Sequence, residues 1–272
     1  PHFNFLSDPY RSRYLWPPMT VISAVIITRN EARNIQRCIS SLKNVADEVI
    51  VVDAESDDGT RELAKQRGAE VHVRTWTNYS DQKNFANSLA KNSYILSMDA
   101  DEALSPELEA SLLQLKQKQL DAVYSVSRYT NYCGHWVKHG GWYPDAKVRL
   151  FPKKDTRWEG AHVHETLVLP KGMKEVRLRG DLLHYSYHTI ADHKNRIQRY
   201  STLHAQSMFE NGRKAGVVKR WSSPVAKFIQ GYLFQLGFLD GWAGWKIATL
   251  SARAVYLKYS KLSQLNRGGT IS

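Results

Sequence analysis

The chain has 272 residues and carries 38 Lys and Arg against 26 Asp and Glu, a net charge of +12. This length allows one large domain, or one domain with a small appendage, and excludes several unrelated domains. With 42% hydrophobic and 24% charged residues, the composition is that of a globular protein and excludes disorder over the main body.

The charge and the cysteines narrow the partners and the compartment. A positive excess favours anionic partners, and nucleic acid, anionic lipid and a phosphorylated glycan all fit it. Cys38 and Cys133 show neither metal-ligand spacing nor a disulfide framework, which indicates a reducing cytoplasm. The apolar run at 21–27 is too short for a secretory signal, and no stretch reaches the length of a membrane span.

The first 18 residues carry proline and aromatic residues without a helix or strand period. Met19 is followed at once by a strand pattern, so we expect the biological start at Met19. Residues 1–18 are then a leader or a cloning remnant.

From residue 21 the pattern alternates between strand and helix. β-Branched and apolar runs predict strands at 21–28, 48–53, 70–73 and 94–98. Apolar residues at helical spacing predict helices at 31–43, 60–66 and 81–91. A further helix begins after Ser105, which is the expected cap, with Pro106 in the first helical position.

This alternation predicts an α/β fold with a mostly parallel sheet and helices on both faces. Ligands of such sheets bind at the carboxyl ends of the strands. Polar clusters follow three of the predicted strands, at 28–31, 53–60 and 99–101, so we expect them to converge on one edge. After residue 121 strand-like pieces occur at 122–128 and 147–151, and the chain turns helical after Ile190.

Asp99 and Asp101 flank one small residue at the end of a predicted strand. Alternating side-chain direction would send both carboxylates to the same side if the strand geometry persists. Hard oxygen ligands of this kind suit Mg²⁺ or Mn²⁺, which would neutralise a leaving diphosphate. The alternative is a strand-to-helix turn, where Asp is common.

Asp53 ends a buried strand and could accept a hydrogen bond from a base or a ribose. Asp57 or Asp58 after it would be the cap of the next helix.

Glu165, in the segment HVHET, is the candidate base that removes a proton from an acceptor hydroxyl. His162 and His164 beside it raise a zinc hypothesis, which is weak because they lie two residues apart with no cysteine nearby. His184 is either a third ligand of the divalent ion or a hydrogen-bonded core histidine.

The segment 225–262 interleaves Trp, Phe, Tyr and Leu with Lys227, Lys246, Arg253 and Lys258. Such a stretch could lie in a membrane interface, or its apolar stripe could face a protein core.

With these residues assembled, the chain resembles glycosyltransferase family 2, the inverting enzymes of GT-A fold. The blocks that carry the resemblance are AVIITRNEARNI, VIVVDAESDDGT, DQKNFANS and YILSMDADE, which occur in the family's order. A longer likeness, through WEGAHVHETL, LLHYSY and GFLDGWAGW, is to the lipopolysaccharide inner-core β-1,4-glucosyltransferases, which place glucose on a heptose.

The resemblance implies roles for matching positions. Residues that would contact the nucleotide-sugar donor are Thr28, Arg29, Asn30, Glu31, Asp53, Gln82, Lys83, Asp99 and Ala100. Asp101, with Asp99 and His184, would bind Mg²⁺ or Mn²⁺. Glu165 falls where the family keeps its catalytic acidic residue, often the Asp of a Glu-Asp pair, and the His164-Glu165 pair here departs from that pattern.

The resemblance also implies an activity and an organisation. The enzyme would transfer a hexose, glucose from UDP-glucose, to a heptose of the lipopolysaccharide inner core with a β linkage, at the cytoplasmic face of the bacterial inner membrane. The catalytic domain would span 19–190, with a nucleotide-sugar half at 19–101 and an acceptor half at 102–190. A helical region at 191–272 would contact the anionic membrane surface.

Other functions stay open at this point. Another UDP-sugar or another lipid-linked glycan would suit the same family, because spacing does not place the residues that distinguish hexoses. Nucleotidyl transfer would show a glycine-rich phosphate loop, and TRNEARN contains no glycine. A basic nucleic-acid-binding protein would want basic residues where the acidic clusters lie, so we expect no nucleic-acid partner.

Overall fold

The computed structural model describes residues 20–160, 165–214 and 216–271. The predicted leader at 1–18 lies outside these residues. By their contacts the residues divide into one unit of residues 1–126 and 148–180 and a second of residues 127–147 and 181–272. The predicted division at residue 190 stays a prediction.

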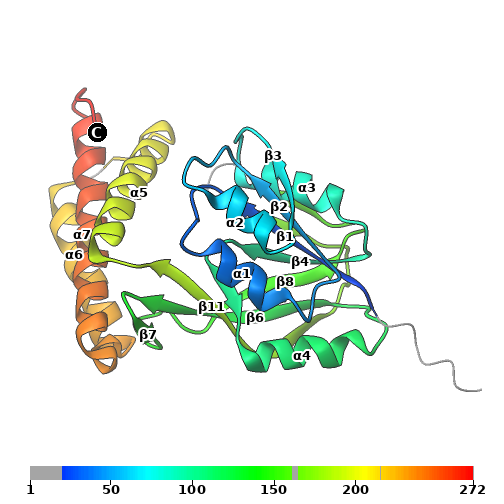
Figure 1. Cartoon of the computed structure of the whole chain (residues 1–272). Helices are drawn as coiled ribbons and strands as arrows, with labels where there is room; N and C mark the ends of the chain where they lie inside the picture. The colour runs from blue at the N-terminus through cyan, green and yellow to red at the C-terminus, as the bar shows by residue number, and fades with distance from the viewer. Residues whose placement is uncertain (1–19, 161–164, 215, 272) are drawn as a thin grey trace, which may run out of the picture. The chain divides into compact units, whose positions relative to one another are not determined.

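The elements follow in chain order (Figure 1). The strands are β1 (Ile22–Thr28), β2 (Glu48–Asp53), β3 (Glu70–Val73), β4 (Tyr94–Asp99), β5 (Glu102–Leu104), β6 (Val123–Tyr132), β7 (His135–Val137), β8 (Asp145–Pro152), β9 (Arg157–Glu159), β10 (Thr166–Val168) and β11 (Glu175–Tyr187). The helices are α1 (Ile35–Leu42), α2 (Thr60–Gln66), α3 (Tyr79–Leu89), α4 (Pro106–Lys116), α5 (Ile190–Glu210), α6 (Val217–Ile229), a π-helical turn η1 (Gln230–Phe234), a 3₁₀ turn η2 (Gly237–Asp240) and α7 (Gly241–Leu265).

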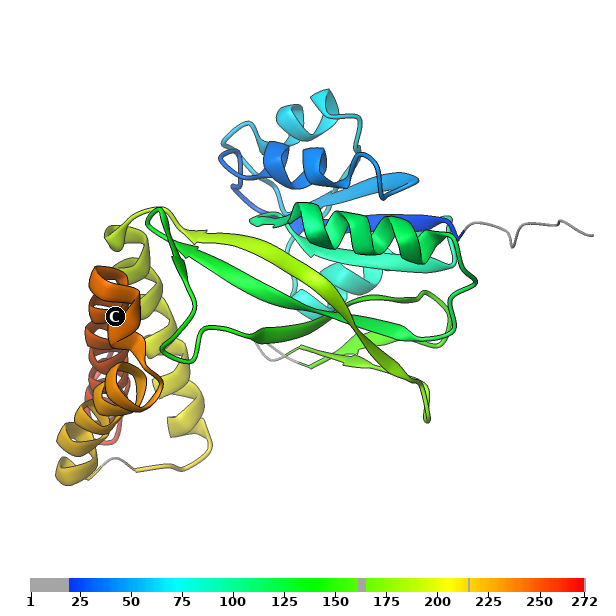
Figure 2. The ribbon, with the colours of Figure 1, turned by 90° about the horizontal axis from the view of Figure 1, so that it is seen from below.

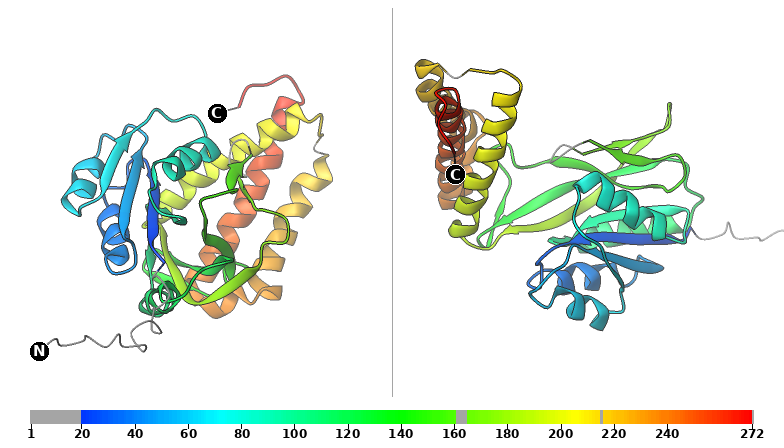
Figure 3. Two further views of the ribbon diagram at one scale, coloured as in Figure 1. Left: turned by 90° about the vertical axis from the view of Figure 1, so that its right-hand side faces the viewer. Right: turned by 90° about the horizontal axis from the view of Figure 1, so that it is seen from above.

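The first half of the chain builds the parallel part of the sheet, in the order β3-β2-β1-β4. β1, β2 and β4 are near-continuous apolar runs, as expected of strands with helices on both faces, whereas β3 at the edge is partly exposed. Right-handed crossovers place α1 and α2 on one face, and the reversal of strand order at β1 sends α3 to the other (Figure 3). The predicted α/β class with helices on both faces is confirmed.

The rest of the sheet is mixed, which corrects the expectation of a mostly parallel one. β8 pairs antiparallel with β4, and the order continues through β6 and β11 to β5, with β7 paired to β6. β6 and β7 form an antiparallel hairpin, whereas helices join the parallel strands of the first half. A separate two-stranded sheet joins β9 to β10.

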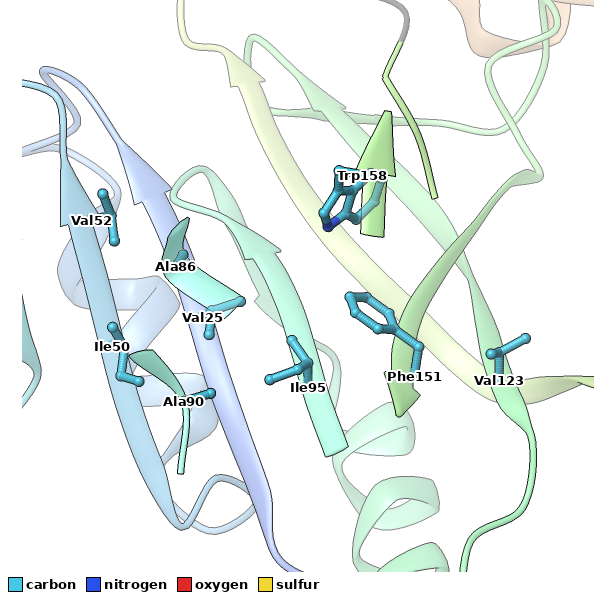
Figure 4. Close-up of a cluster of buried hydrophobic side chains, with 9 residues drawn as sticks. All are labelled: Val25, Ile50, Val52, Ala86, Ala90, Ile95, Val123, Phe151 and Trp158. Atoms are coloured by element: carbon cyan, nitrogen blue, oxygen red, sulfur yellow. The ribbon is translucent and has the colours of Figure 1, made fainter. Parts of the chain in front are cut away.

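A cluster of buried side chains lies between α3 and the sheet (Figure 4). Ala86 and Ala90 come from α3 and the chain just after it, and Ile95 and Phe151 come from the adjacent strands β4 and β8. Trp158 closes the cluster from β9, its ring centroid 6.0 Å from that of Phe151. This packing fixes the position of α3 against the sheet.

The second unit contains the three long C-terminal helices, with α7 packed against both α5 and α6 (Figure 2). α5 begins with a capping box between Thr189 and Asp192, which places its start at the predicted point. Among the described helices, none is long and apolar enough to cross a membrane.

Candidate active site

Strand register brings the predicted polar clusters together. Thr28 pairs with Asp53 across β1 and β2, and Ile27 pairs with Asp99 across β1 and β4. The three strands therefore end at one level, and the predicted convergence at the carboxyl edge of the sheet is confirmed.

The turn after β1 is tied to the loop after β2. Asn30 has a φ of 55°, its amide donates to Ser56 Oγ at 2.8 Å, and its Oδ1 accepts from the Asp57 amide at 3.0 Å. The Glu31 amide donates to Thr60 Oγ1 at 2.9 Å. A left-handed residue held by two partners in the loop after β2, with a third bond from its neighbour Glu31, forms a preorganised wall. The Arg29 side chain at this turn is exposed.

Two predicted donor-binding residues carry buried polar atoms without a partner in the described structure. The Thr28 hydroxyl and Gln82 Oε1 both lack a hydrogen-bond partner there. Thr28 is 6% exposed and Gln82 is fully buried. Gln82 Nε2 donates only a long 3.4 Å bond to the Arg74 carbonyl. An unsatisfied buried group costs about 1–3 kcal/mol, and a hydrogen bond from a bound ligand would relieve that cost.

Asp53 is fully buried, and its carboxylate is already engaged. It accepts from the Ser56 amide at 2.9 Å and from the Ser56 hydroxyl, with Arg61 Nε at 3.8 Å. Its role toward a base or ribose stays a prediction.

Asp58 accepts from the amide and hydroxyl of Thr60, the first residue of α2. The N-cap of α2 is Gly59, without a side-chain capping bond, so the prediction that Asp57 or Asp58 caps this helix is wrong. Partial burial raises the pKa of Asp58, but these hydrogen bonds and those of other backbone amides outweigh it, so its pKa is lowered.

Lys83 links two of the predicted functional carboxylates. Its ammonium lies 2.9 Å from Glu165 Oε1 and 3.7 Å from Asp99 Oδ1, and the residue is only 4% exposed. It also lies 4.5 Å from the centroid of the Trp158 ring, a cation–π contact. The candidate base, the candidate metal ligand and one fixed cation therefore share one site.

Arg149 supports the same site from β8. Its guanidinium donates to Asp99 Oδ2 at 2.7 Å and to Glu102 Oε1, while Glu102 Oε2 accepts from the Asp99 amide at 2.9 Å. Burial lowers the pKa of Arg149, but the carboxylates of Asp99 and Glu102 outweigh it, so its pKa is raised and it stays charged.

The Asp99-Ala100-Asp101 segment is a turn and not a continuous strand. β4 ends at Asp99, and β5 begins only at Glu102. Alternation of side chains along a strand therefore does not govern Asp101, which corrects the geometric reason for grouping the two carboxylates. Ala100 is buried and Asp101 is half-buried.

The possible metal ligands at this turn are the carboxylate oxygens of Asp99 and Asp101. Such oxygens suit a hard divalent ion, and Asp99 is partly exposed. Within the described residues, no group of three His, Cys, Asp or Glu side chains is arranged to hold a metal ion. A metal at this turn would need ligands from the donor or from solvent, as Mg²⁺ commonly takes in phosphate sites.

Cys38 lies beneath the turn, with Sγ 3.6 Å from the Asp99 carbonyl oxygen. Burial above all, and then the charges of Glu102, Asp101 and Asp99, raise the pKa of this thiol well above its usual range. Cys38 therefore packs against the turn as a buried, neutral side chain.

The family follows from comparison with known proteins. The sequence model of glycosyl transferase family 2 matches residues 23–174, more than half of the chain. The chain belongs to glycosyl transferase family 2. The matched range contains every residue of the carboxyl edge described above, and the GT-A fold implied by the sequence resemblance is the fold of this chain.

Relatives cover nearly the whole chain. An uncharacterised glycosyltransferase of Rickettsia prowazekii (strain Madrid E) is 31% identical over 91% of this chain and 88% of its own length. The lipopolysaccharide core biosynthesis glycosyltransferase LpsC of Rhizobium meliloti (strain 1021) is 27% identical over 94% of this chain and 99% of its own. A solved structure of glucosyl-3-phosphoglycerate synthase from Mycobacterium tuberculosis, which holds Mn²⁺ and UDP, is 20% identical to this chain. The match covers 41% of this chain and 44% of the synthase. Its TM-score of 0.35 is too low to transfer structural detail.

Histidines predicted as metal ligands lie elsewhere. His184 belongs to the second unit, where it is buried in β11 with Nδ1 3.1 Å from Thr130 Oγ1. Its role as a third ligand stays a prediction. His162 and His164, which raised the zinc hypothesis, lie outside the described residues.

Sequence reasoning missed three members of this family 2 site: Arg149, Glu102 and Trp158. An arginine inside the apolar run VRLF was a signal for Arg149, because a buried guanidinium needs carboxylates nearby. Glu102 directly follows the Asp99 motif and offered the matching charge. Trp158 had no signal, since only the tertiary fold places it on Lys83.

Proposed function

We propose that this family 2 member transfers a hexose, glucose from UDP-glucose, to a heptose of the lipopolysaccharide inner core with inversion to a β linkage. The observation that carries the proposal is the Lys83 ammonium held between Glu165 and Asp99 at the carboxyl edge of the sheet. Family membership supports sugar transfer. The name of the Rhizobium meliloti relative supports a core oligosaccharide acceptor.

The donor would lie along the preorganised wall formed by the loops after β1 and β2. Thr28 and Gln82 would satisfy their buried polar atoms on the nucleotide. Arg29, Asn30, Glu31 and Asp53 border the same edge, and Ala100 would contact the donor at the turn. These assignments extend the family's pattern to the residues found there.

Asp101 and Asp99 would hold Mg²⁺ or Mn²⁺, with the remaining ligands supplied by the donor or by solvent. When bound, such an ion neutralises negative charge on the diphosphate leaving group. Arg149 holds Asp99 in place, since one guanidinium bridges that carboxylate to Glu102. Lys83 adds a fixed positive charge at the same point, where developing negative charge is stabilised without reorganisation.

Glu165 would act as the base. It takes the proton of the acceptor hydroxyl, whose oxygen attacks the anomeric carbon as the bond from that carbon to the UDP oxygen breaks. The product is the β-linked sugar with UDP as the leaving group. The ion pair with Lys83 holds the carboxylate at one position, which general-base catalysis requires.

A donor screen tests the proposal. Purified chain is mixed with each UDP-sugar, Mn²⁺ or Mg²⁺, and core oligosaccharide that ends in heptose, and UDP release is measured with and without acceptor. We expect acceptor-dependent release with UDP-glucose above the other donors. Release with a different UDP-sugar would correct the donor, and no release with any of them, together with salt-sensitive retention on DNA, would contradict the proposal.

We also propose a cytoplasmic location at the membrane surface, where a lipid-borne acceptor lies. Residues 211–272 contain ten Lys and Arg and one acidic residue, Asp240, so they carry +9 of the net +12. Juxtamembrane cations of this density are attracted to anionic lipid.

An exposed apolar stripe accompanies this charge in the second unit. Along α6, Val217, Trp221, Val225 and Ile229 recur every four residues and are 68%, 60%, 59% and 36% exposed. η1 continues the stripe with Phe234, which is 81% exposed. Exposed apolar side chains interleaved with cations are typical of helices that lie in a lipid interface, and like charge disfavours covering the stripe with a second copy.

The stripe is tested with vesicles. We expect the full chain to sediment with phosphatidylcholine vesicles that contain phosphatidylglycerol, less so at high salt, and Trp221→Ser with Val225→Ser to weaken binding about tenfold or more. Val73→Ser, at a residue of the first unit that is 54% exposed, is the matched control and should bind like the parent chain. Equal binding by the double variant would contradict this surface.

A further inference from the structure

A cavity lies in the second unit, and none of the candidate active-site residues lines it. It has a volume of about 430 Å³, within the range of small-molecule sites. It lies along α5 and α7, which pack side by side (Figure 2). Its lining residues are Tyr187, His193, Arg196, Ile197, Tyr200, Ser201, His204, Ala254, Val255 and Lys258.

The cavity forms where α7 contributes small side chains to its interface with α5. Ala254 and Val255 of α7 face it, whereas further along the same pair of helices Ala205 packs against Tyr259 and Leu262 in a closed core. The helix pair is therefore filled at one level and open at another, which places a defined pocket in an otherwise packed interface.

The lining is cationic. Arg196 and Lys258 contribute two positive charges, and the lining contains no carboxylate. α7 carries no acidic residue, and on α5 Asp192 is used in the capping box that begins the helix. An anion entering this pocket therefore meets two positive side chains and no carboxylate in the lining.

Aromatic rings form the rest of the wall. The Arg196 guanidinium stacks 4.8 Å from the Tyr187 ring centroid, which is 4.7 Å from that of His193. Tyr200 and His204 lie one and two turns further along α5, with ring centroids 6.5 Å apart. Aromatic side chains beside a guanidinium offer apolar faces and hydrogen-bonding edges next to an anion site. A ligand with a polar ring and an anionic substituent would use all three.

We propose that this cavity binds a sugar phosphate, with the phosphate held by Arg196 and Lys258 and the sugar ring against Tyr187 and Tyr200. Guanidinium and ammonium groups are the usual phosphate partners in proteins. The proposal goes beyond the proposed function, because none of the residues assigned to donor, metal or base lines this cavity.

Calorimetric titration of the full chain tests it with glucose 6-phosphate, glucose, inorganic phosphate and dihexanoylphosphatidic acid. We expect glucose 6-phosphate to bind more tightly than the other three. Arg196→Gln and Lys258→Gln should each weaken binding about tenfold or more, the value of a charged hydrogen bond. Arg199→Gln on α5 and Arg253→Gln on α7, both exposed and outside the lining, are matched controls expected to bind like the parent chain.

Several results would overturn the proposal. They are unchanged binding in Lys258→Gln, equal binding of inorganic phosphate, tighter binding of the short-chain lipid, and displacement of glucose 6-phosphate by UDP with Mn²⁺, which would place it in the donor site. Arg196 also bonds Ser186 and stacks on Tyr187, so its variant is compared with the parent by circular dichroism. Lys258 makes no side-chain hydrogen bond to the part of the chain that the structure describes, so Lys258→Gln carries the test alone if Arg196→Gln unfolds.

Discussion

At the scale of single residues, Lys83 is the centre of the candidate active site. One ammonium of a nearly buried residue pairs with Glu165 and lies near Asp99. Removing one partner of a buried pair is costly because the remaining charge is left unpaired. The chain therefore holds the candidate base and the candidate metal turn in a fixed relation before any substrate arrives.

Replacing Glu165 tests the assignment of the base. Glu165→Gln keeps the shape and a hydrogen-bond acceptor for Lys83 but cannot take a proton, so turnover should fall about 100-fold or more while UDP binding is retained. Glu159→Gln, at an exposed residue of β9, is the control and should keep normal turnover. Near-normal turnover of Glu165→Gln at saturating donor and acceptor would show that another group is the base.

Arg149 and Glu102 form a buried pair whose loss affects stability first. Arg149→Met leaves Glu102, which is 1% exposed, without its cation, and we expect the free energy of unfolding to fall by about 3–5 kcal/mol. The double variant with Glu102→Gln should recover part of that loss, because no unpaired charge then stays buried. Urea unfolding measures both, and an additive double variant would contradict the pairing.

At the scale of elements, the sequence predicted those parts of the fold that local patterns determine. β1 to β4 and the helices between them follow from apolar runs and helical spacing, and Ser105 caps α4 as expected, accepting from the Leu108 amide at 3.2 Å. β5, β7, β9, β10 and the length of β11 were missed, since they form through pairing between distant segments. The link from Lys83 to Glu165 was missed for the same reason, as 82 residues separate them.

His193 joins α5 to β6 and makes the second unit sensitive to acid. Its Nδ1 lies 2.9 Å from the Tyr132 hydroxyl, and burial, followed by the charge of Arg196, lowers its pKa from the usual 6.5 to about 4. Between pH 6.5 and about pH 4 the unfolded chain binds a proton at this histidine that the folded chain does not. The stability that His193 contributes is therefore complete above the unfolded pKa of 6.5 and is lost as the pH falls toward 4.

The size of that loss can be measured against a variant that does not titrate. We expect this one group to remove about 2 kcal/mol of unfolding free energy between pH 7 and pH 5. His193→Asn should show a pH dependence smaller by that amount in urea unfolding. Parallel curves for the two proteins would mean that His193 does not titrate differently on folding.

At the scale of the whole molecule, charge is divided along the sequence. The last 62 residues carry +9, so residues 1–210 carry only +3 of the total of +12. The carboxyl edge with its acidic residues belongs to the first unit, and the cationic, apolar helices belong to the second. The net charge therefore suits a partner of the helical unit, such as an anionic surface, without demanding basic residues at the candidate active site.

We propose that the Asp99-Ala100-Asp101 turn binds a UDP-sugar through a divalent ion. Calorimetric titration of UDP into the full chain, with Mn²⁺ and again with EDTA, tests it most directly. We expect binding to require Mn²⁺ and to weaken about tenfold or more in Asp101→Asn, which loses a charged ligand. Equal UDP affinity with and without Mn²⁺, or in the parent chain and Asp101→Asn, would contradict it.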